Sequence, residues 1–398
     1  MRVSRADRGR LAGWWFTVDH GLLTAVLVLA AIGVVLSLAA SPAVALKKGY
    51  EAFHFVERHV AFTAASLAVL VAVSLMTPSA VRRLSWGLLG LSLAALVAVH
   101  LTGVEVNGAR RWLRVAGYSL QPSEFAKPAF VVVSAWLLAE AMRRRDMPGL
   151  PVAAALLVAF AALLVSQPDV GQTLLVTVVW GAQFFLSGQP LVAALVLVVM
   201  GAGGLAAAYH VFPHVQSRVD RFLSPNVGDN MQVERAIRSF GEGGFLGRGP
   251  GEGTIKTVLP DAHTDFIFAV VAEEYGVVAC LVLLVLFAFV VLRALRAALR
   301  EPDAATRLAI QGLALLFGLQ ALINMAVNVG LIPAKGMTLP FISAGGSSMV
   351  AVAITLGMLL SLTRRRPDLA RLDAARLRPA VHLGYGGADL SATELHRN

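Results

Sequence analysis

Basic side chains suited to binding phosphate stand in three short segments rich in residues that interrupt helices. Arg110 and Arg111 lie in NGARRW, Arg248 lies in a glycine-rich run, and Lys335 lies in LIPAKGM. A guanidinium group binds phosphate with two parallel hydrogen bonds, and a lysine ammonium binds it as a point charge. These residues predict a site for an anionic head group. The alternatives are a solvated loop for the arginines and a snorkelling surface side chain for Lys335.

A carboxylate that could act as a general base lies in LPDAHTDF, residues 259–266. Asp261, His263 and Asp265 precede an apolar run, where desolvation raises a carboxyl pKa and nearby arginines lower it. Asp265 could therefore take a proton from a sugar hydroxyl near neutral pH. The favourable interaction of an acid with a helix N-terminus explains one of the two aspartates equally well. We assign the chemistry to Asp265.

Four further polar side chains lie next to or inside apolar runs. Glu273 and Glu274 lie deeper in the run that follows Asp265, and we assign this pair to structural support. Asp169 and Gln172 in SQPDVGQ are either ligand groups or the start of a helix, and the sequence leaves both interpretations open.

A glycine-rich run and a possible helix cap complete the set of polar stretches. Seven of the thirteen residues between Gly241 and Gly253 are glycine, so backbone amides could form an anion-binding nest there. No Walker lysine follows this run, which argues against nucleotide binding. We expect Ser123 and Glu124 to cap the helix that they open.

The composition shows what must position these residues. The 398 residues are 57% hydrophobic and only 15% charged, with a net charge of +10 and a mean hydropathy of +0.71. Soluble domains carry about 25% charged residues, so this chain must be solvated by lipid. Its single cysteine, Cys280, excludes internal disulfides and cysteine metal clusters.

Apolar runs long enough to cross a bilayer recur along most of the chain, since a spanning helix needs about 20 residues. They predict an all-α polytopic membrane protein with about ten transmembrane helices. We interpret the first run as a retained helix. The predicted cores are 20–41, 58–76, 83–101, 125–142, 150–166, 169–187, 190–210, 264–292, 306–330 and 343–363.

The distribution of lysine and arginine predicts the orientation. With the N-terminus inside, the inner segments hold 20 of these residues and the short outer segments hold 8, as the positive-inside rule requires. Both termini are then cytoplasmic, and the large loop 211–263 between helices seven and eight is extracytoplasmic. We expect three parts: an N-terminal segment 1–19, a membrane domain 20–365 and a disordered cytoplasmic tail 366–398.

Four motifs together resemble the SEDS family of shape, elongation, division and sporulation proteins, and most closely its FtsW-like cell-division branch. The resemblance covers about residues 15 to 365. Its most specific parts are LIPAKGMTLPFISAGGSS at 331–348, LPDAHTDF at 259–266, GGFLGRGPGEG at 243–253, and NGARRW with LQPSE within 107–124. Two positions depart from the family pattern: Asp261 stands where Glu is common, and Ala344 stands where Tyr is common.

The resemblance implies a peptidoglycan glycosyltransferase of the bacterial inner membrane that polymerises lipid II at the division septum. Its implied partners are the growing glycan strand, a class B penicillin-binding transpeptidase, other divisome proteins and membrane lipid, with no nucleic acid. No organic cofactor is implied, and a divalent cation, Mg²⁺ or Mn²⁺, could share the pyrophosphate charge. Asp265 matches the family's essential acid. The residues expected to bind substrate are Arg110, Arg111, Lys335, Arg248, His263 and Ser347.

Two other functions use the same head group. A transporter would flip lipid II across the membrane, but it needs a polar route through the whole bilayer, and the inner halves of these runs are poor in polar residues. A scaffold would recruit the transpeptidase without catalysis. We rank the polymerase first, with Asp265 as general base on the C4 hydroxyl of the acceptor sugar.

Overall fold

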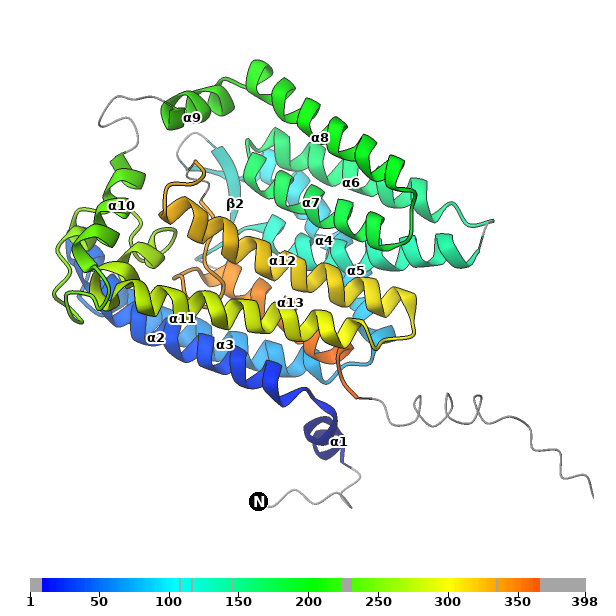
Figure 1. The fold of residues 1–398 in the computed structure, drawn as a ribbon, viewed down its shortest axis with the longest axis horizontal. Helices are drawn as coiled ribbons and strands as arrows, with labels where there is room; N and C mark the ends of the chain where they lie inside the picture. The colour runs from blue at the N-terminus through cyan, green and yellow to red at the C-terminus, as the bar shows by residue number, and fades with distance from the viewer. Residues whose placement is uncertain are drawn as a thin grey trace, which may run out of the picture. The chain divides into compact units, whose positions relative to one another are not determined.

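The computed structural model describes residues 9–106, 109–115, 117–144, 146–223, 231–333 and 336–365. The chain divides into two units, 1–364 and 365–398, and the architecture below is that of the first. The whole of the expected tail, 366–398, and the first eight residues lie outside the described residues. Each of the ten predicted apolar cores coincides with one helix (Figure 1). These helices are α2 His20–Lys47, α3 His54–Ser74, α4 Pro78–Thr102, α5 Pro122–Arg143, α6 Gly149–Ser166, α7 Val170–Leu186, α8 Leu191–Val211, α11 Ile267–Ala298, α12 Ala304–Asn328 and α13 Gly346–Leu362.

Eight of these helices are long and apolar enough to cross a membrane, and α7 and α13 are shorter apolar helices. The total of ten spans therefore stays a prediction. Side-chain caps explain several of the helix starts, because they satisfy free backbone amides of the first turn. Asp19 caps α2, Thr77 caps α4, Asp169 caps α7 and Asp303 caps α12.

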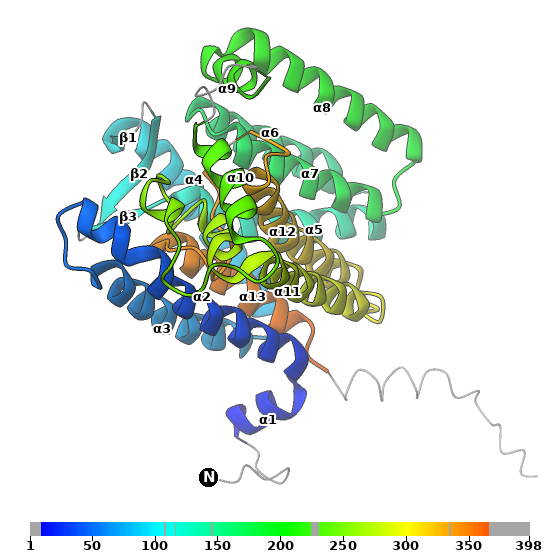
Figure 2. The ribbon, with the colours of Figure 1, turned by 60° about the vertical axis from the view of Figure 1, so that its left-hand side comes forward.

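The helices differ in how far they are covered by protein. α5 packs against α4 and α12, α13 packs against α3, and α11 lies between α2 and α12. In the apolar window of α5, 72% of the residues are buried, whereas none is buried in α8. α8 contacts α7 and α9 and runs along one edge of the helices (Figures 1 and 2). Its apolar side chains are thus left for lipid.

Several elements outside the predicted helices were not expected from the sequence. A small antiparallel sheet in the order β1-β2-β3 occupies the connection between α4 and α5, with strands Val104–Val106, Ala109–Val115 and Tyr118–Leu120. Helices α9 Pro213–Leu223 and α10 Met231–Gly243 lie in the 211–263 segment, and a 3-10 turn covers Ile255–Thr257. A short helix, α1 Arg10–Thr17, precedes α2.

Helix α11 is interrupted near its start. Gly276 has φ 78° and ψ 177°, a conformation that costs little only without a Cβ. The backbone of the glycine-rich segment passes close by, because the Val277 amide donates to Gly244 O (3.0 Å) and the Val278 amide donates to Phe245 O (3.2 Å). This kink places the segment after α10 against the first turns of α11.

Candidate active site

Two asparagines of α12 hold the backbone of Asp265 in place. Asn324 Nδ2 donates to Asp265 O (2.8 Å), and Asn328 Nδ2 donates to the same oxygen (3.0 Å). Asn324 Nδ2 also donates to Met337 O (2.6 Å), and Asn328 Oδ1 accepts from the Ala269 amide (3.0 Å). The residues just before α11 are therefore fixed to α12 and to the segment that follows Lys335.

The Asp265 carboxyl lies in a half-buried position just outside α11. Burial and, to a smaller extent, the neighbouring Asp261 carboxylate together raise its pKa to about 7. A Cβ added at Gly336 would lie 3.5 Å from Asp265 Oδ2, so the 336–340 segment passes close to the carboxyl. Asp265 is thus a base with a pKa near neutrality, as a proton acceptor requires. Lys335 itself lies outside the described residues.

His263 lies in the same loop and is buried. Its ring packs against Phe55, with centroids 5.0 Å apart. Burial lowers its pKa to about 4, and the Lys48 ammonium contributes in the same direction, so the imidazole is neutral at pH 7. Its Nδ1 is buried without a hydrogen-bond partner among the described residues. His263 therefore offers a neutral polar group beside the base.

Hydrogen bonds join the segment between α12 and α13 to the loop that carries Asp265. Ser343 Oγ donates to Thr264 O (2.6 Å) and accepts from the Leu339 amide (2.7 Å). The Ala344 amide donates to His263 O (2.9 Å). Position 344 thus contributes its backbone amide to the site, a hydrogen bond that every residue except proline can make.

A buried ion pair lies between α5, α7 and α12. Lys127 Nζ donates to Glu124 Oε1 (2.8 Å), Gln172 Oε1 (2.9 Å) and Gln320 Oε1 (3.0 Å). All three donor positions of the ammonium are filled, which is what a buried charge needs. A small cavity adjoins this cluster and is lined by Glu124, Lys127, Gln320 and Thr355 with apolar neighbours.

This cluster corrects one expectation and resolves another. Gln121 is the N-cap of α5 and no side chain caps that helix, so Glu124 pairs with Lys127 instead of capping, and the capping expectation for Ser123 and Glu124 was wrong. Asp169 Oδ1 accepts from the Gln172 amide (3.3 Å). Asp169 therefore begins a helix, while Gln172 binds Lys127.

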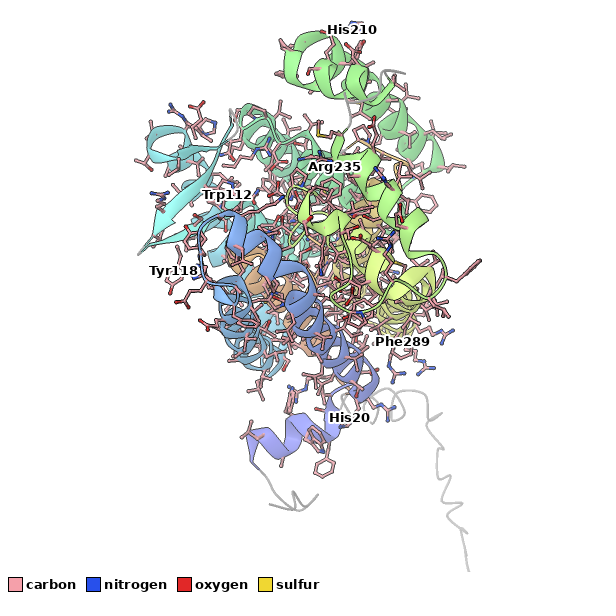
Figure 3. The ribbon with its side chains drawn as sticks, turned by 90° about the vertical axis from the view of Figure 1, so that its left-hand side faces the viewer. His20, Trp112, Tyr118, His210, Arg235 and Phe289 are labelled. Carbon is pink, nitrogen blue, oxygen red and sulfur yellow. The ribbon has the colours of Figure 1, made fainter. Side chains whose placement is uncertain are left out.

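Arg110 and Arg111 lie on β2 of the small β1-β2-β3 sheet, called here the hairpin, and have different surroundings. Arg111 donates from Nε to Gln167 O (2.9 Å) and from Nη2 to Pro168 O, so two of its donors hold the turn between α6 and α7. Arg110 is exposed and forms a 3.4 Å ion pair with Glu105 on the neighbouring strand. Figure 3 shows the hairpin with Trp112 and Tyr118, and α10 with Arg235 across from it.

The glycine-rich segment binds the carboxylates of the chain's own glutamates. The amides of Thr254, Ile255 and Lys256 donate to the Glu273 carboxylate at 2.6, 2.7 and 3.0 Å. The Gly251 amide donates to Glu274 Oε2 (3.2 Å), and Lys256 Nζ pairs with Glu274. Of these four amides only that of Gly251 lies within the run Gly241–Gly253, and because it binds a carboxylate of the chain itself, the expected nest for a ligand anion is wrong at Gly251. Glu273 and Glu274 have the supporting role assigned to them.

The remaining predicted site residues have structural partners as well. Arg248 pairs with Glu242 and donates from Nη1 to Thr254 Oγ1 (3.2 Å). Ser347 Oγ accepts from the Gln121 amide (3.4 Å) and so links the starts of α13 and α5. The described residues contain no group of three His, Cys, Asp or Glu side chains placed to hold a metal ion. The divalent cation stays an untested expectation.

Sequence reasoning missed the three polar residues of α12 that shape the site, Gln320, Asn324 and Asn328. Their spacing of four residues places them on one face of an otherwise apolar helix, and this pattern was available as a signal. Together, the described residues bring Asp265, His263 and Gly336 to one place, held by Asn324 and Asn328.

Comparisons with known proteins identify relatives along nearly the whole chain. The family model FTSW_RODA_SPOVE, described as "Cell cycle protein", matches residues 20–367. A probable peptidoglycan glycosyltransferase FtsW from Caulobacter vibrioides is 46% identical over 387 residues, which are 97% of both chains. A protein with the same name from Trichlorobacter lovleyi is 35% identical over 359 residues, covering 87% of this chain and 93% of the relative.

Solved structures share the fold. A chain from a study of polymerization and crosslinking by a peptidoglycan synthase complex matches with a TM-score of 0.74 and 29% identity, covering 88% of this chain and 98% of the other. The rod shape determining protein RodA of Thermus thermophilus matches with a TM-score of 0.63 and 26% identity, covering 88% and 97%. The predicted class, an all-α polytopic membrane protein, is confirmed.

Proposed function

Because this chain belongs to the FtsW/RodA/SpoVE family of cell cycle proteins, we propose that it is a peptidoglycan glycosyltransferase of the bacterial membrane that polymerises lipid II. The resemblance to the SEDS family and its FtsW-like branch is confirmed by the family match and by relatives with this name. The observation that carries the chemistry is the Asp265 carboxyl, fixed through its backbone by two asparagines and given a pKa of about 7 by burial.

Asp265 acts as general base in the proposed reaction. Its carboxylate takes the proton from the C4 hydroxyl of the acceptor sugar while that oxygen attacks C1 of the donor sugar. The new bond is the β-1,4 glycosidic link, and the bond that breaks is the one from C1 to the pyrophosphate oxygen. Undecaprenyl pyrophosphate leaves with the electron pair. Attack opposite the leaving group inverts C1.

Cations stabilise the charge that develops on the leaving group. Lys335, the neighbour of Gly336, and Arg110, which is exposed on the hairpin, are the first candidates. Arg111 and Arg248 bring further positive charge, and their existing contacts hold loop backbone and side chains in place. His263, neutral beside the base, and Ser347 supply polar contacts to the sugar.

The protein works with a cross-linking partner in this proposal. The similar chain of known structure belongs to a peptidoglycan synthase complex that coordinates polymerization and crosslinking, and glycan strands need a transpeptidase to be joined. We expect a class B penicillin-binding protein in this role, within the division machinery at the septum. Membrane lipid surrounds the helices, and both termini face the cytoplasm.

The variant Asp265→Asn tests the base. It keeps the size of the side chain and removes its basicity, and general-base catalysis contributes about 10²–10⁴-fold. The purified variant should therefore fold and still bind its partner but polymerise lipid II slower by at least that order. Asp265→Glu should also be impaired, because a base displaced by about an ångström can cost on the order of 10²-fold.

Two outcomes would contradict the proposal. A well-folded Asp265→Asn protein that makes glycan strands at the parent rate would exclude the base. A variant that polymerises normally but no longer moves lipid II across vesicles would favour the transporter instead.

A further inference from the structure

Three aromatic side chains lie together where the α2–α3 connection enters α3: Tyr50 in the connection, and His54 and Phe55 in the first turn of α3. They are called here the aromatic platform. The Tyr50 and His54 rings stack with centroids 4.7 Å apart and planes 10° apart. The Phe55 ring packs against Tyr50 at 5.8 Å and against His54 at 5.3 Å. Tyr50 is 50% exposed, so its ring is open to a ligand.

The aromatic platform is continuous with the candidate active site. The Phe55 ring lies 5.0 Å from the His263 ring, and His263 precedes Asp265 by two residues in the loop before α11. Two ring-to-ring steps, each comparable with the width of a sugar ring, therefore lead from Tyr50 to His263. A saccharide that reacts at Asp265 would therefore reach Tyr50 with the sugar two positions along its chain, the first one beyond the reacting disaccharide.

Charged side chains lie beside the aromatic platform, together with the exposed apolar side chains of Leu46 and Phe53. Lys48 Nζ lies 5.6 Å from the centre of the Phe55 ring, and Lys47, Lys48 and Glu51 are exposed. A sugar ring packs its C–H face on an aromatic ring and keeps its hydroxyl groups for water and polar side chains. An aromatic face with lysines beside it suits such a ligand, whereas a lipid tail would meet the charged groups.

We propose that the aromatic platform is a subsite for the growing glycan strand, where Tyr50 stacks against the first sugar beyond the reacting disaccharide, a sugar that is present only once a strand has formed. This inference rests on the proposed polymerase function. The aromatic platform lies at the end of α2 and the start of α3, so it meets the water-soluble part of the substrate and not the polyprenyl tail. Stacking there would keep the product strand on the enzyme between additions.

Strand length is the quantity that tests the proposal. Purified protein in lipid vesicles, with cross-linking inhibited, would be given lipid II, and both the first coupling and the strand-length distribution would be measured. Loss of one stacked ring should weaken strand binding about 2- to 10-fold. Tyr50→Ala should therefore shorten the strands by a similar factor and leave the first coupling unchanged. Tyr50→Phe keeps the ring and should restore the parent length.

A matched control separates sugar stacking from a general effect of exposed aromatic residues at membrane surfaces. Phe53, in the same connection as Tyr50, is 57% exposed, and Phe53→Ala should leave strand length unchanged. Strands of parent length from Tyr50→Ala would overturn the subsite. Equal shortening by both variants would assign Tyr50 to membrane anchoring and would overturn it too. If the parent makes no glycan at all, the proposed function fails, which is a different result.

Discussion

The Asp265 carboxyl should set the pH dependence of polymerisation. Its pKa is raised to about 7, so the basic form gains population as the pH rises through 7. We expect kcat/KM to rise about tenfold per pH unit below pH 7 and to level off above it, since the free enzyme must bind substrate with this carboxyl ionised. A pH profile of the purified protein measures this.

Asp261 provides a control for that profile. Its carboxylate is the second cause of the raised Asp265 pKa, and its φ of 52° lies in the left-handed region that Asn adopts readily. Asp261→Asn should therefore keep the backbone and move the midpoint of the profile to lower pH. An unchanged midpoint would show that another group controls the observed titration.

Lys335 is the second residue with a testable role. Its neighbour Gly336 passes close to Asp265, which supports a cation held toward the lipid pyrophosphate. Lys335→Ala should strongly weaken the use of lipid II at low concentration. Lys335→Arg should rescue it only in part, because a planar fork replaces a point charge. Full activity of Lys335→Ala at low lipid II would return the residue to a snorkelling role, and steady-state kinetics distinguish the two.

At the scale of elements, the local stability of residues 251–257, at the end of the glycine-rich segment, should depend on the buried Glu273 carboxylate. Glu273 accepts three backbone amides at 2.6–3.0 Å, and hydrogen bonds to a charged group contribute about 1.5–3 kcal/mol each. Glu273→Gln removes that charge and leaves one acceptor oxygen. We expect amide hydrogen exchange over residues 251–257 to become at least about tenfold faster.

The control for this prediction lies in the same segment. Glu252 is exposed, so Glu252→Gln should leave the exchange of the segment unchanged. Equal exchange in the parent and in Glu273→Gln would mean that the segment is held by other contacts, such as those between Gly244, Phe245 and the kink at Gly276.

The helices could be predicted from the sequence more fully than the elements that join them. Runs of about 20 apolar residues leave lipid as the only solvent, so each predicted core became a helix. The hairpin was missed because its strands are short, and the arginine-rich β2, Ala109–Val115, has the composition of a solvated loop. The partner of the glycine-rich amides, Glu273, lies about twenty residues further along the chain, a contact that local patterns do not encode.

The same limit applies to the candidate site. Asp265 could be predicted because a carboxylate at the start of an apolar run is costly and needs a reason. Its positioning by Asn324 and Asn328 depends on α12 packing beside α11, which only the fold establishes. The ion pair of Glu124 and Lys127 was missed for a related reason, since its partners Gln172 and Gln320 come from two other helices.

At the scale of the whole molecule, a buried polar side chain links three helices in the half of the bundle away from Asp265. Gln183 Nε2 donates to Val131 O (3.0 Å) and Leu308 O (3.1 Å), which ties α7 to α5 and α12. This polar side chain is thus used for helix packing. The candidate active site lies at the other end, with the Asp265 loop.

The 20 inner and 8 short-loop outer basic residues predict, by the positive-inside rule, that the loop with Asp265 lies outside. Cys280 is buried, so an introduced cysteine on the surface can be labelled selectively. Glu252→Cys, in the exposed glycine-rich segment, should react with an impermeant thiol reagent in intact cells. Asp146→Cys, in the exposed connection between α5 and α6, should react only after the inner face is opened. The reverse pattern would place the proposed active site on the wrong side of the membrane for strand synthesis.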